Sequence, residues 1–242
     1  MFKPYLDDYY KSKINVKEMC KKVGSSPTSF QRWLKKNGFL PRQEYLKHID
    51  TGIEELNRVL KNRYSSIINR CNGGSTDQYG HYAGMDYIAV YEWVIFCNAQ
   101  REHLQVLWQS YILHYKNSRY AVSIDRINEK EGYVIRNMQF VTHGFNSWKR
   151  ILNPVSVTHD GEVDYFMSCE EASYFYGLRR QAIGECLNRT EFHIKGYIVK
   201  PIDVEAVLSK HKLSTLVEYY DMLLSRDNKG WDTRKRWKNN HR

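Results

Sequence analysis

Residues 120–150, YAVSIDRINEKEGYVIRNMQFVTHGFNSWKR, contain the pattern that most limits what this chain can fold into. Residues 121–127 and 133–141 are short runs rich in β-branched and aromatic residues, and each predicts a strand. The polar residues 128–132 predict a turn between the strands, and 144–151 have helical periodicity. The run predicts strand, loop, strand and helix in a short length of chain, so we expect an α+β fold.

The charge of the chain favours a nucleic-acid partner. Its 37 Lys and Arg residues outnumber its 27 Asp and Glu residues, which gives a net charge of +10, and the pI is about 9.2. Proteins that follow a phosphate backbone have this balance. On composition alone, a basic protein that binds no nucleic acid stays open.

The sequence predicts neither a membrane span nor a disulfide framework. Its longest apolar runs are well below the roughly 20 residues that a bilayer-spanning helix needs. The N-terminus, MFKPYLDDYYK, has no secretory signal pattern, so we expect a cytoplasmic protein. The cysteines are odd in number and never spaced C-x-x-C, which predicts reduced, mostly buried thiols and no structural zinc site. They are Cys20, Cys71, Cys97, Cys169 and Cys186.

Residues 14–39 predict two short helices joined by a turn. Gly24 ends the first helix, and Ser26-Pro27 begins the second as N-cap and first-position proline. The segment resembles a helix-turn-helix, whose second helix enters the DNA major groove. An ordinary helical hairpin with a solvated charged face stays open. The DNA contacts that the resemblance implies are Thr28, Ser29, Gln31, Arg32 and Lys35.

The run at 120–150 resembles the core of HNH (ββα-metal) nucleases, in particular homing endonucleases of phages and mobile elements. That core has Asp-His on its first strand, followed by N-L-Q-x-x-C-x-x-C-N-x-x-K across the second strand and the helix. The optional zinc-binding cysteines of the family are replaced here by Thr142 and Phe145, so we expect an apolar core in place of that zinc. The matching residues are Asp125-Arg126, Asn137-Met138-Gln139, Asn146 and Lys149.

The resemblance implies a role for each of these residues. Asp125 and Asn146 are expected to hold one divalent cation, Mg²⁺ or Mn²⁺, because hard oxygen ligands suit these ions. Asn137 is expected to brace the loop and so to hold the first strand in place. Lys149 and Arg150, farther along the helix, are expected to face DNA phosphate.

Arg126 departs from the family pattern, which has a histidine as general base at this position. Arginine stays protonated at any usable pH and accepts no proton from water. Three outcomes are open: His143 takes the role of base, His81 in the loop YGHYAG takes it, or cutting is lost. A metal-bound water needs less help from a base, so slow cutting without a replacement base also stays open. Arg126 can instead hold the scissile phosphate. Taken singly, each of these residues also fits an ordinary structural role.

The segment 158–202 resembles the small modular DNA-binding repeats attached to phage and intron-encoded homing nucleases. Ser168 and Glu171 predict a capping box at the start of one helix, Gly177 ends it, and a second helix follows. Any capped helix pair shares half of this pattern. The implied DNA contacts are Arg179, Arg180 and Gln181.

Together these patterns predict a site-specific, homing-type DNA endonuclease that acts on double-stranded DNA as a monomer and requires no protein partner. The competing prediction is a DNA-binding regulator that retained the nuclease scaffold and lost cutting, which Arg126 favours. The predicted regions are a helix-turn-helix (1–45), connecting helices and loops (46–118), the HNH core (119–152), the modular repeat (158–202), and a C-terminal helix with a basic tail (203–242).

Overall fold

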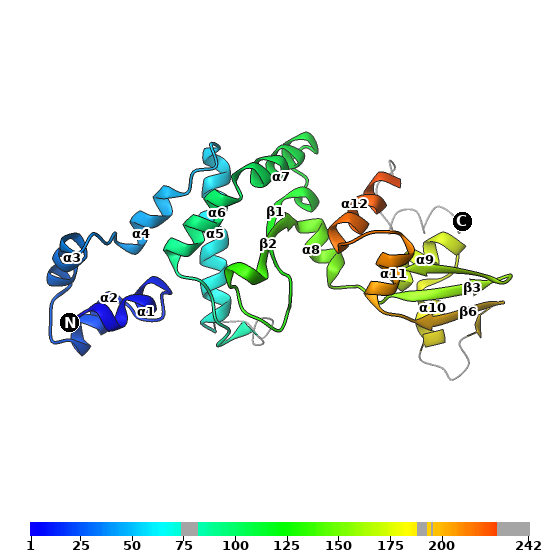
Figure 1. Ribbon diagram of the computed structural model, residues 1–242, viewed down its shortest axis with the longest axis horizontal. Coiled ribbons are helices and arrows are strands. Elements are labelled where there is room, and N and C mark those ends of the chain that lie inside the picture. The colour runs from blue at the N-terminus through cyan, green and yellow to red at the C-terminus, as the bar shows by residue number, and fades with distance from the viewer. Residues whose placement is uncertain (74–81, 188–192, 195, 227–242) are drawn as a thin grey trace. The chain divides into compact units, whose positions relative to one another are not determined.

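The computed structural model describes residues 1–73, 82–187, 193–194 and 196–226. It divides into two compact units, Met1–Asn146 and Ser147–Arg242, both drawn as ribbons in Figure 1. Helices and strands are both present, so the predicted α+β class is confirmed. His81 and the basic end of the tail, from residue 227 onward, lie outside the described residues.

The first unit is mainly helical. Helices α2 (Val16–Lys22) and α3 (Pro27–Lys36) coincide with the helix pair predicted over 14–39. Gly24 has a φ of 62° after α2, and the Ser26 side chain caps α3 by accepting a hydrogen bond from the Ser29 backbone. The remaining helical segments are η1 (Lys3–Tyr5), α1 (Leu6–Tyr10), α4 (Arg42–Tyr45), η2 (Leu46–His48), α5 (Glu54–Cys71), α6 (Val90–Ala99), α7 (Arg101–Leu113) and η4 (Ser118–Tyr120).

The predicted region of connecting helices and loops (46–118) contains a turn between His48 and Glu54. In that turn the Thr51 hydroxyl donates to Asn57 Oδ1 at 2.7 Å, and Gly52 has a φ of 76°. This positive φ favours glycine, which has no Cβ atom to strain the backbone there. The turn sets where α5 begins, and α5 then continues to Cys71.

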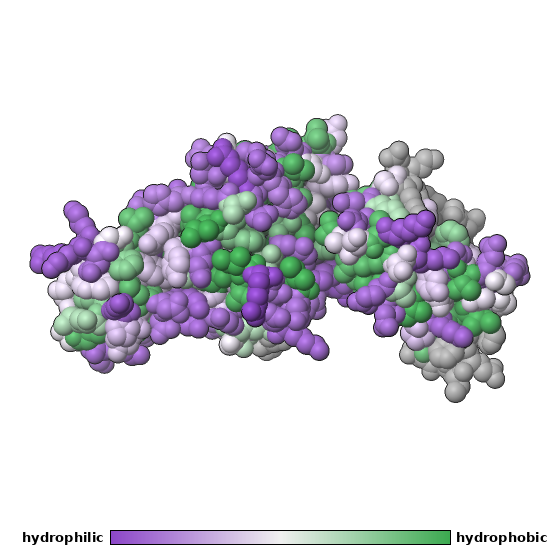
Figure 2. All heavy atoms as spheres, in the orientation of Figure 1, coloured by the Kyte–Doolittle hydropathy of each residue, from purple (hydrophilic) through white to green (hydrophobic). Residues whose placement is uncertain are grey.

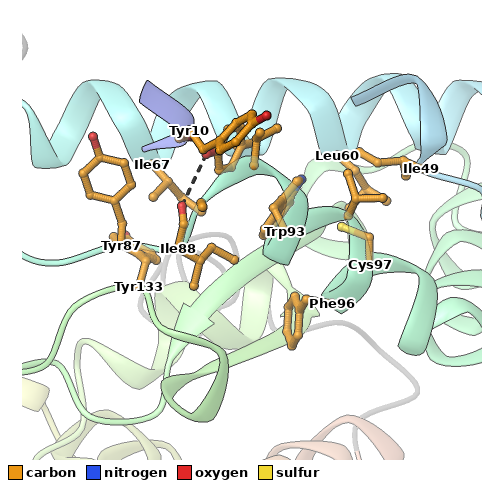
Figure 3. Packing of buried hydrophobic residues seen from close by; sticks show 14 of the residues in the cluster. Tyr10, Ile49, Leu60, Ile67, Tyr87, Ile88, Trp93, Phe96, Cys97 and Tyr133 are labelled. Atoms are coloured by element: carbon orange, nitrogen blue, oxygen red, sulfur yellow. Dashed lines mark hydrogen bonds between the residues drawn. The ribbon is translucent and has the colours of Figure 1, made fainter. Parts of the chain in front are cut away.

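One cluster of buried side chains joins the helices of the first unit to its strands. In Figure 3, Leu60 on α5 lies close to Cys97 on α6, with Trp93 and Phe96 also on α6. Phe140 on β2 packs against Trp93 and Phe96, with ring centroids 5.7 and 5.0 Å apart. Such aromatic pairs stabilise by about 0.5–1.5 kcal/mol beyond the area that they bury. The strands are therefore held against α6.

The predicted order of strand, loop, strand and helix is present in the first unit. Strand β1 (Val122–Arg126) pairs antiparallel with β2 (Met138–Thr142), and α8 (His143–Lys149) follows directly. The second strand begins later than position 133, because η5 (Ile135–Asn137) forms a tight 3-10 turn. Before that turn, a Cβ atom at Gly132 would lie 2.0 Å from the Asp86 carbonyl oxygen, so only glycine fits there.

The second unit contains a four-stranded antiparallel sheet in the order β4-β3-β6-β5. The strands are β3 (Val155–His159), β4 (Glu162–Phe166), β5 (His193–Ile194) and β6 (Tyr197–Pro201). Helices α9 (Cys169–Tyr176) and α10 (Arg180–Leu187) pack on the sheet through a small core that includes Val155, Ala172, Ile183 and Val199. Strand β3 begins directly after Pro154 and was not predicted from the sequence.

The predicted single C-terminal helix is wrong, because two helices occupy that region. Helix α11 (Val204–Lys210) ends near Lys212, which has a φ of 59°, and α12 (Leu216–Arg226) begins after a new cap. The Glu218 backbone N–H donates to the Thr215 hydroxyl at 3.2 Å, and the Glu218 carboxylate accepts from the Ser214 backbone at 2.7 Å. These bonds satisfy donors at the start of α12.

Within the part of the chain that the structure describes, no helix is both long and apolar enough to cross a membrane. Figure 2 shows one face on which hydrophilic side chains surround smaller hydrophobic patches. Among the described residues, Cys20, Cys71, Cys97 and Cys169 are buried, which confirms the predicted burial of these thiols. The side chain of Cys186 lies outside the described part.

Candidate functional site

Strand β1 has a polar face that carries Asp125. Side chains alternate along a strand, so Ser123 and Asp125 share one face, whereas Ile124 and Arg126 share the other. Asp125 is paired in register with Gln139 on β2, and Gln139 Nε2 donates to Asp125 Oδ2 at 2.8 Å. The carboxylate is only 4% exposed. Gln139 thus fixes the orientation of a buried carboxylate.

Helix α8 brings Asn146 to the same strand. Asn146 Nδ2 donates to Ser123 Oγ and to the Ile124 carbonyl oxygen, both at 3.0 Å. Because the amide nitrogen is engaged in this way, Oδ1 is the atom that can offer lone pairs to a cation. The helix after the hairpin therefore bonds Asn146 to the strand that carries Asp125.

The donor atoms of this site fit a hard cation. The Asp125 carboxylate and the Asn146 amide oxygen are the oxygen ligands that Mg²⁺ and Mn²⁺ prefer. Among the described residues, no cluster of three His, Cys, Asp or Glu side chains could hold a metal ion. A cation at Asp125 would therefore complete its coordination with neutral oxygen atoms, including water and substrate, as Mg²⁺ commonly does.

Asn137 lies at the closed end of the hairpin and is 3% exposed. Its Oδ1 accepts from the Asn128 backbone N–H at 2.7 Å, and its Nδ2 donates to the carbonyl oxygens of Asn128 and Gly132 at 2.9 and 3.0 Å. One side chain thus satisfies three backbone groups of the loop after β1. These bonds hold the loop in a single conformation beside the end of the strand.

Arg126 lies on the opposite face of β1 from Asp125 and is 7% exposed. Its Nη1 donates to the carbonyl oxygens of Glu129 and Glu131 at 2.7 and 2.9 Å. Its guanidinium also lies over the rings of Tyr82 and Tyr133, 4.6 and 5.3 Å from their centroids. The structure therefore does not bring Arg126 together with Asp125 and Asn146, but uses it to clamp the loop.

His143 is the first residue of α8, and its side chain is exposed. Its backbone N–H donates to the Ala121 carbonyl oxygen at 2.8 Å, so His143 lies beside Ala121. At about 3.3 Å per residue, roughly 13 Å of strand separates Ala121 from Asp125. The structure thus places this histidine at the far end of β1 from the buried carboxylate.

Of the residues expected to contact DNA, those on α3 are exposed on one helix, whereas the candidates farther along the chain differ in their burial. Phe30 and Leu34 anchor α3 in the core. In the second unit, Lys149 is half-buried in the last turn of α8, and Arg150 and Arg179 are exposed. Arg180 and Gln181 begin α10, but their side chains lie outside the described part. The exposed candidates on α3 are Thr28, Ser29, Gln31, Arg32 and Lys35.

Arg63 on α5 is a neighbour of this site that the sequence did not suggest. Its Nε and Nη2 both donate to the Val122 carbonyl oxygen, at 3.1 and 2.9 Å. Burial, and then the positive charge of Arg70, lower the pKa of the Arg63 guanidinium. No local pattern could have indicated this contact, because α5 and β1 are far apart along the chain.

No protein-family model matches the chain, and no curated protein matches it. Among solved structures, the chain is similar to one described as "DNA binding and cleavage by the HNH homing endonuclease I-HmuI", with a TM-score of 0.21 and 19% sequence identity. The similarity covers 40% of this chain and 67% of that chain. At this TM-score it says nothing about individual residues, whose roles rest on the contacts described above.

Proposed function

We propose that this chain is a metal-dependent DNA endonuclease of the HNH type, in which Asp125 and Asn146 hold one Mg²⁺ or Mn²⁺ ion. The observation that carries the proposal is the position of Asn146, which is bonded to Ser123 and Ile124 on the strand that carries Asp125. A carboxylate and an amide oxygen from a strand and the helix after it form the oxygen donor set that such an ion requires.

When bound, the cation would neutralise charge on the scissile phosphate and stabilise the leaving 3′ oxygen. The residues around it fix the two ligands. Gln139 orients the Asp125 carboxylate, and Ser123 holds the amide nitrogen of Asn146. Asn137 fixes the loop at the end of β1. Such supporting contacts commonly contribute a factor of about 10–100 in metal affinity or activity.

We assign DNA recognition to the helix pair of region 1–45 and to the modular repeat at 158–202, which precede and follow the core at 119–152 in the sequence. The net charge of +10 supports attraction to a phosphate backbone. The exposed Gln31 and Arg32 on α3 have the forked polar groups that pair with base edges. Two reading modules on one chain suit a monomer that recognises a long, asymmetric site.

One observation favours a second candidate, a DNA-binding regulator without cutting activity. Arg126 stands where the HNH pattern has its general base, and its guanidinium is occupied by the loop carbonyls. Because arginine stays protonated, it supplies no proton acceptor. A protein that retained only the scaffold would have this substitution.

Incubation with supercoiled plasmid DNA in Mg²⁺ or Mn²⁺ separates the two candidates. We expect the wild-type protein to nick or linearise the plasmid, and Asp125→Asn and Asn146→Ala to abolish this activity. Glu102→Gln, at an exposed position on α7, is the control and should cut normally. Tight DNA binding with no nicking in either cation would reject the enzyme and leave the regulator.

A further inference from the structure

The geometry points to Arg63 as the residue that binds the scissile phosphate, next to a cation held by Asp125 and Asn146. This inference rests on the proposed nuclease function. It assigns to α5 the contact that the sequence suggested for Arg126, whose guanidinium lies on the other face of β1 and clamps the loop.

Arg63 and Asn146 occupy neighbouring positions along one edge of β1. His143 N–H bonds to the Ala121 carbonyl, and Ile127 N–H bonds to the Asn137 carbonyl, so Ala121 and Ile127 point their backbone groups toward β2. The carbonyls of Val122 and Ile124 therefore point away from β2, at the outer edge of the hairpin. The Arg63 guanidinium donates to the Val122 carbonyl oxygen, and Asn146 Nδ2 donates to the Ile124 carbonyl oxygen.

The separation of these two positions suits a bridging phosphate. Carbonyls two residues apart on a strand are about 7 Å apart. A phosphate oxygen lies about 2.1 Å from a bound Mg²⁺, and another accepts from a guanidinium at about 2.8 Å. The phosphate group itself spans the rest of the distance between the two positions. A phosphodiester of this span would reach from a cation held at Asn146 to the guanidinium of Arg63.

The charge around Arg63 also favours an anion. Among the described residues, its guanidinium forms no ion pair, whereas Arg58 on the same helix pairs with Glu55. Arg63 is half-buried, uses its donors on a neutral carbonyl, and feels the repulsion of Arg70. A guanidinium has five N–H donors, so donors remain after Val122 is satisfied. A partly buried charge without a counterion costs free energy, and a bound phosphate would supply that counterion.

Arg63→Gln and Arg63→Lys test this role, with Arg58→Gln as the matched control on α5, where the Arg58 side chain is 74% exposed. Hydrolysis of bis(p-nitrophenyl) phosphate in Mn²⁺ gives kcat and KM, and calorimetry gives the Mn²⁺ affinity. We expect Arg63→Gln to lower kcat/KM by about 100-fold, the effect of removing one donor to a developing anion. Arg63→Lys should lose less, Arg58→Gln should match the wild type, and the Mn²⁺ affinity should not change.

Two results would overturn the assignment: an unchanged kcat/KM in Arg63→Gln, or a loss of Mn²⁺ affinity that accounts for the loss of rate. The second would mean that Arg63 acts only by holding β1. If Arg63→Gln does not fold, Arg63→Lys takes its place, because it retains the charge and a donor for Val122. A lower kcat/KM at unchanged Mn²⁺ affinity would then support the assignment, and an unchanged kcat/KM would overturn it.

If the wild-type protein hydrolyses no phosphodiester, the proposed nuclease function fails, and the role of Arg63 is decided by DNA binding. The probe is then a short DNA duplex in Ca²⁺, with binding followed by fluorescence anisotropy. Weaker binding by Arg63→Gln than by Arg58→Gln would support a phosphate contact at Arg63. Equal binding by the two variants would overturn it.

Discussion

Asp125 and Arg126 are adjacent in the sequence and lie on opposite faces of β1. Asp125 is bonded to Gln139 on the polar face, whereas the Arg126 guanidinium lies 4.6 Å from the centroid of the Tyr82 ring on the other. The end of one strand thus supplies both a candidate metal ligand and an anchor for the loop that follows. Where the HNH pattern has a proton acceptor, this chain has a clamp.

Arg126→Lys should destabilise the first unit, because an ammonium cannot reproduce the planar contacts of a guanidinium. Loss of one charged hydrogen bond and part of the aromatic contact should lower the free energy of unfolding by about 2–3 kcal/mol, as measured in urea. Arg136→Lys, on the same hairpin with its side chain 83% exposed, is the control and should change little. Equal stability of the two variants would show that Arg126 is no clamp.

Asn137→Ala should loosen the loop after β1. It leaves the backbone groups of Asn128 and Gly132 without the partner that they have in the folded protein. We expect a loss of about 2–3 kcal/mol in the free energy of unfolding, together with faster hydrogen exchange at the Asn128 amide. Asn62→Ala, at an exposed position on α5, should be nearly neutral. Unchanged exchange at Asn128 would contradict the bracing role.

Local patterns predicted the elements of the site but not its supports. The strand-forming residues of 121–127 and the helical period after 143 are signals from near neighbours, so β1 and α8 could be predicted. The late start of β2 could not be predicted, because it depends on the hydrogen bond between Asn137 and Asn128. The periodicity of the sequence does not show that contact. The contact of Arg63 with Val122 depends on the packing of α5 and had no sequence signal.

Two errors in the second unit have different causes. Strand β3 was not predicted because Val155–His159 is short and directly follows Pro154, a residue type that is common between elements. The break between α11 and α12 did have a signal, since Thr215 and Glu218 have the spacing of a capping box. The apolar periodicity that continues across Lys212 obscured this signal.

If α3 contacts DNA phosphates and bases, Arg32→Ala and Lys35→Ala should weaken binding in a salt-dependent way. Each lost phosphate contact reduces the slope of log affinity against log salt by roughly 0.9. Lys47→Ala is the control, because the Lys47 ammonium is bonded to Glu44 at 2.8 Å in the first unit. Binding measured by anisotropy at several salt concentrations gives the slopes. Identical slopes for all three variants would exclude α3 from the interface.

Burial raises the pKa of the Cys71 thiol to about 11, while the charges of Arg126 and Arg70 act in the opposite direction. A raised pKa means that the thiol stabilises the fold below its ordinary value near 9, and that this stability is lost as pH rises through about 11. At pH 8 we therefore expect iodoacetamide to label Cys71 slowly in the native protein and rapidly after unfolding in guanidinium. Mass spectrometry measures both rates, and equal rates would contradict the burial.

The central claim is that Asp125 and Asn146 hold one cation, and anomalous scattering from crystals soaked in Mn²⁺ tests it most directly. We expect one strong peak between the Asp125 carboxylate and Asn146 Oδ1, about 2.0–2.2 Å from each oxygen. The peak should be absent from Asp125→Asn crystals soaked in the same way. Mn²⁺ bound elsewhere in a protein that still cuts DNA, with no density at Asp125, would contradict the account.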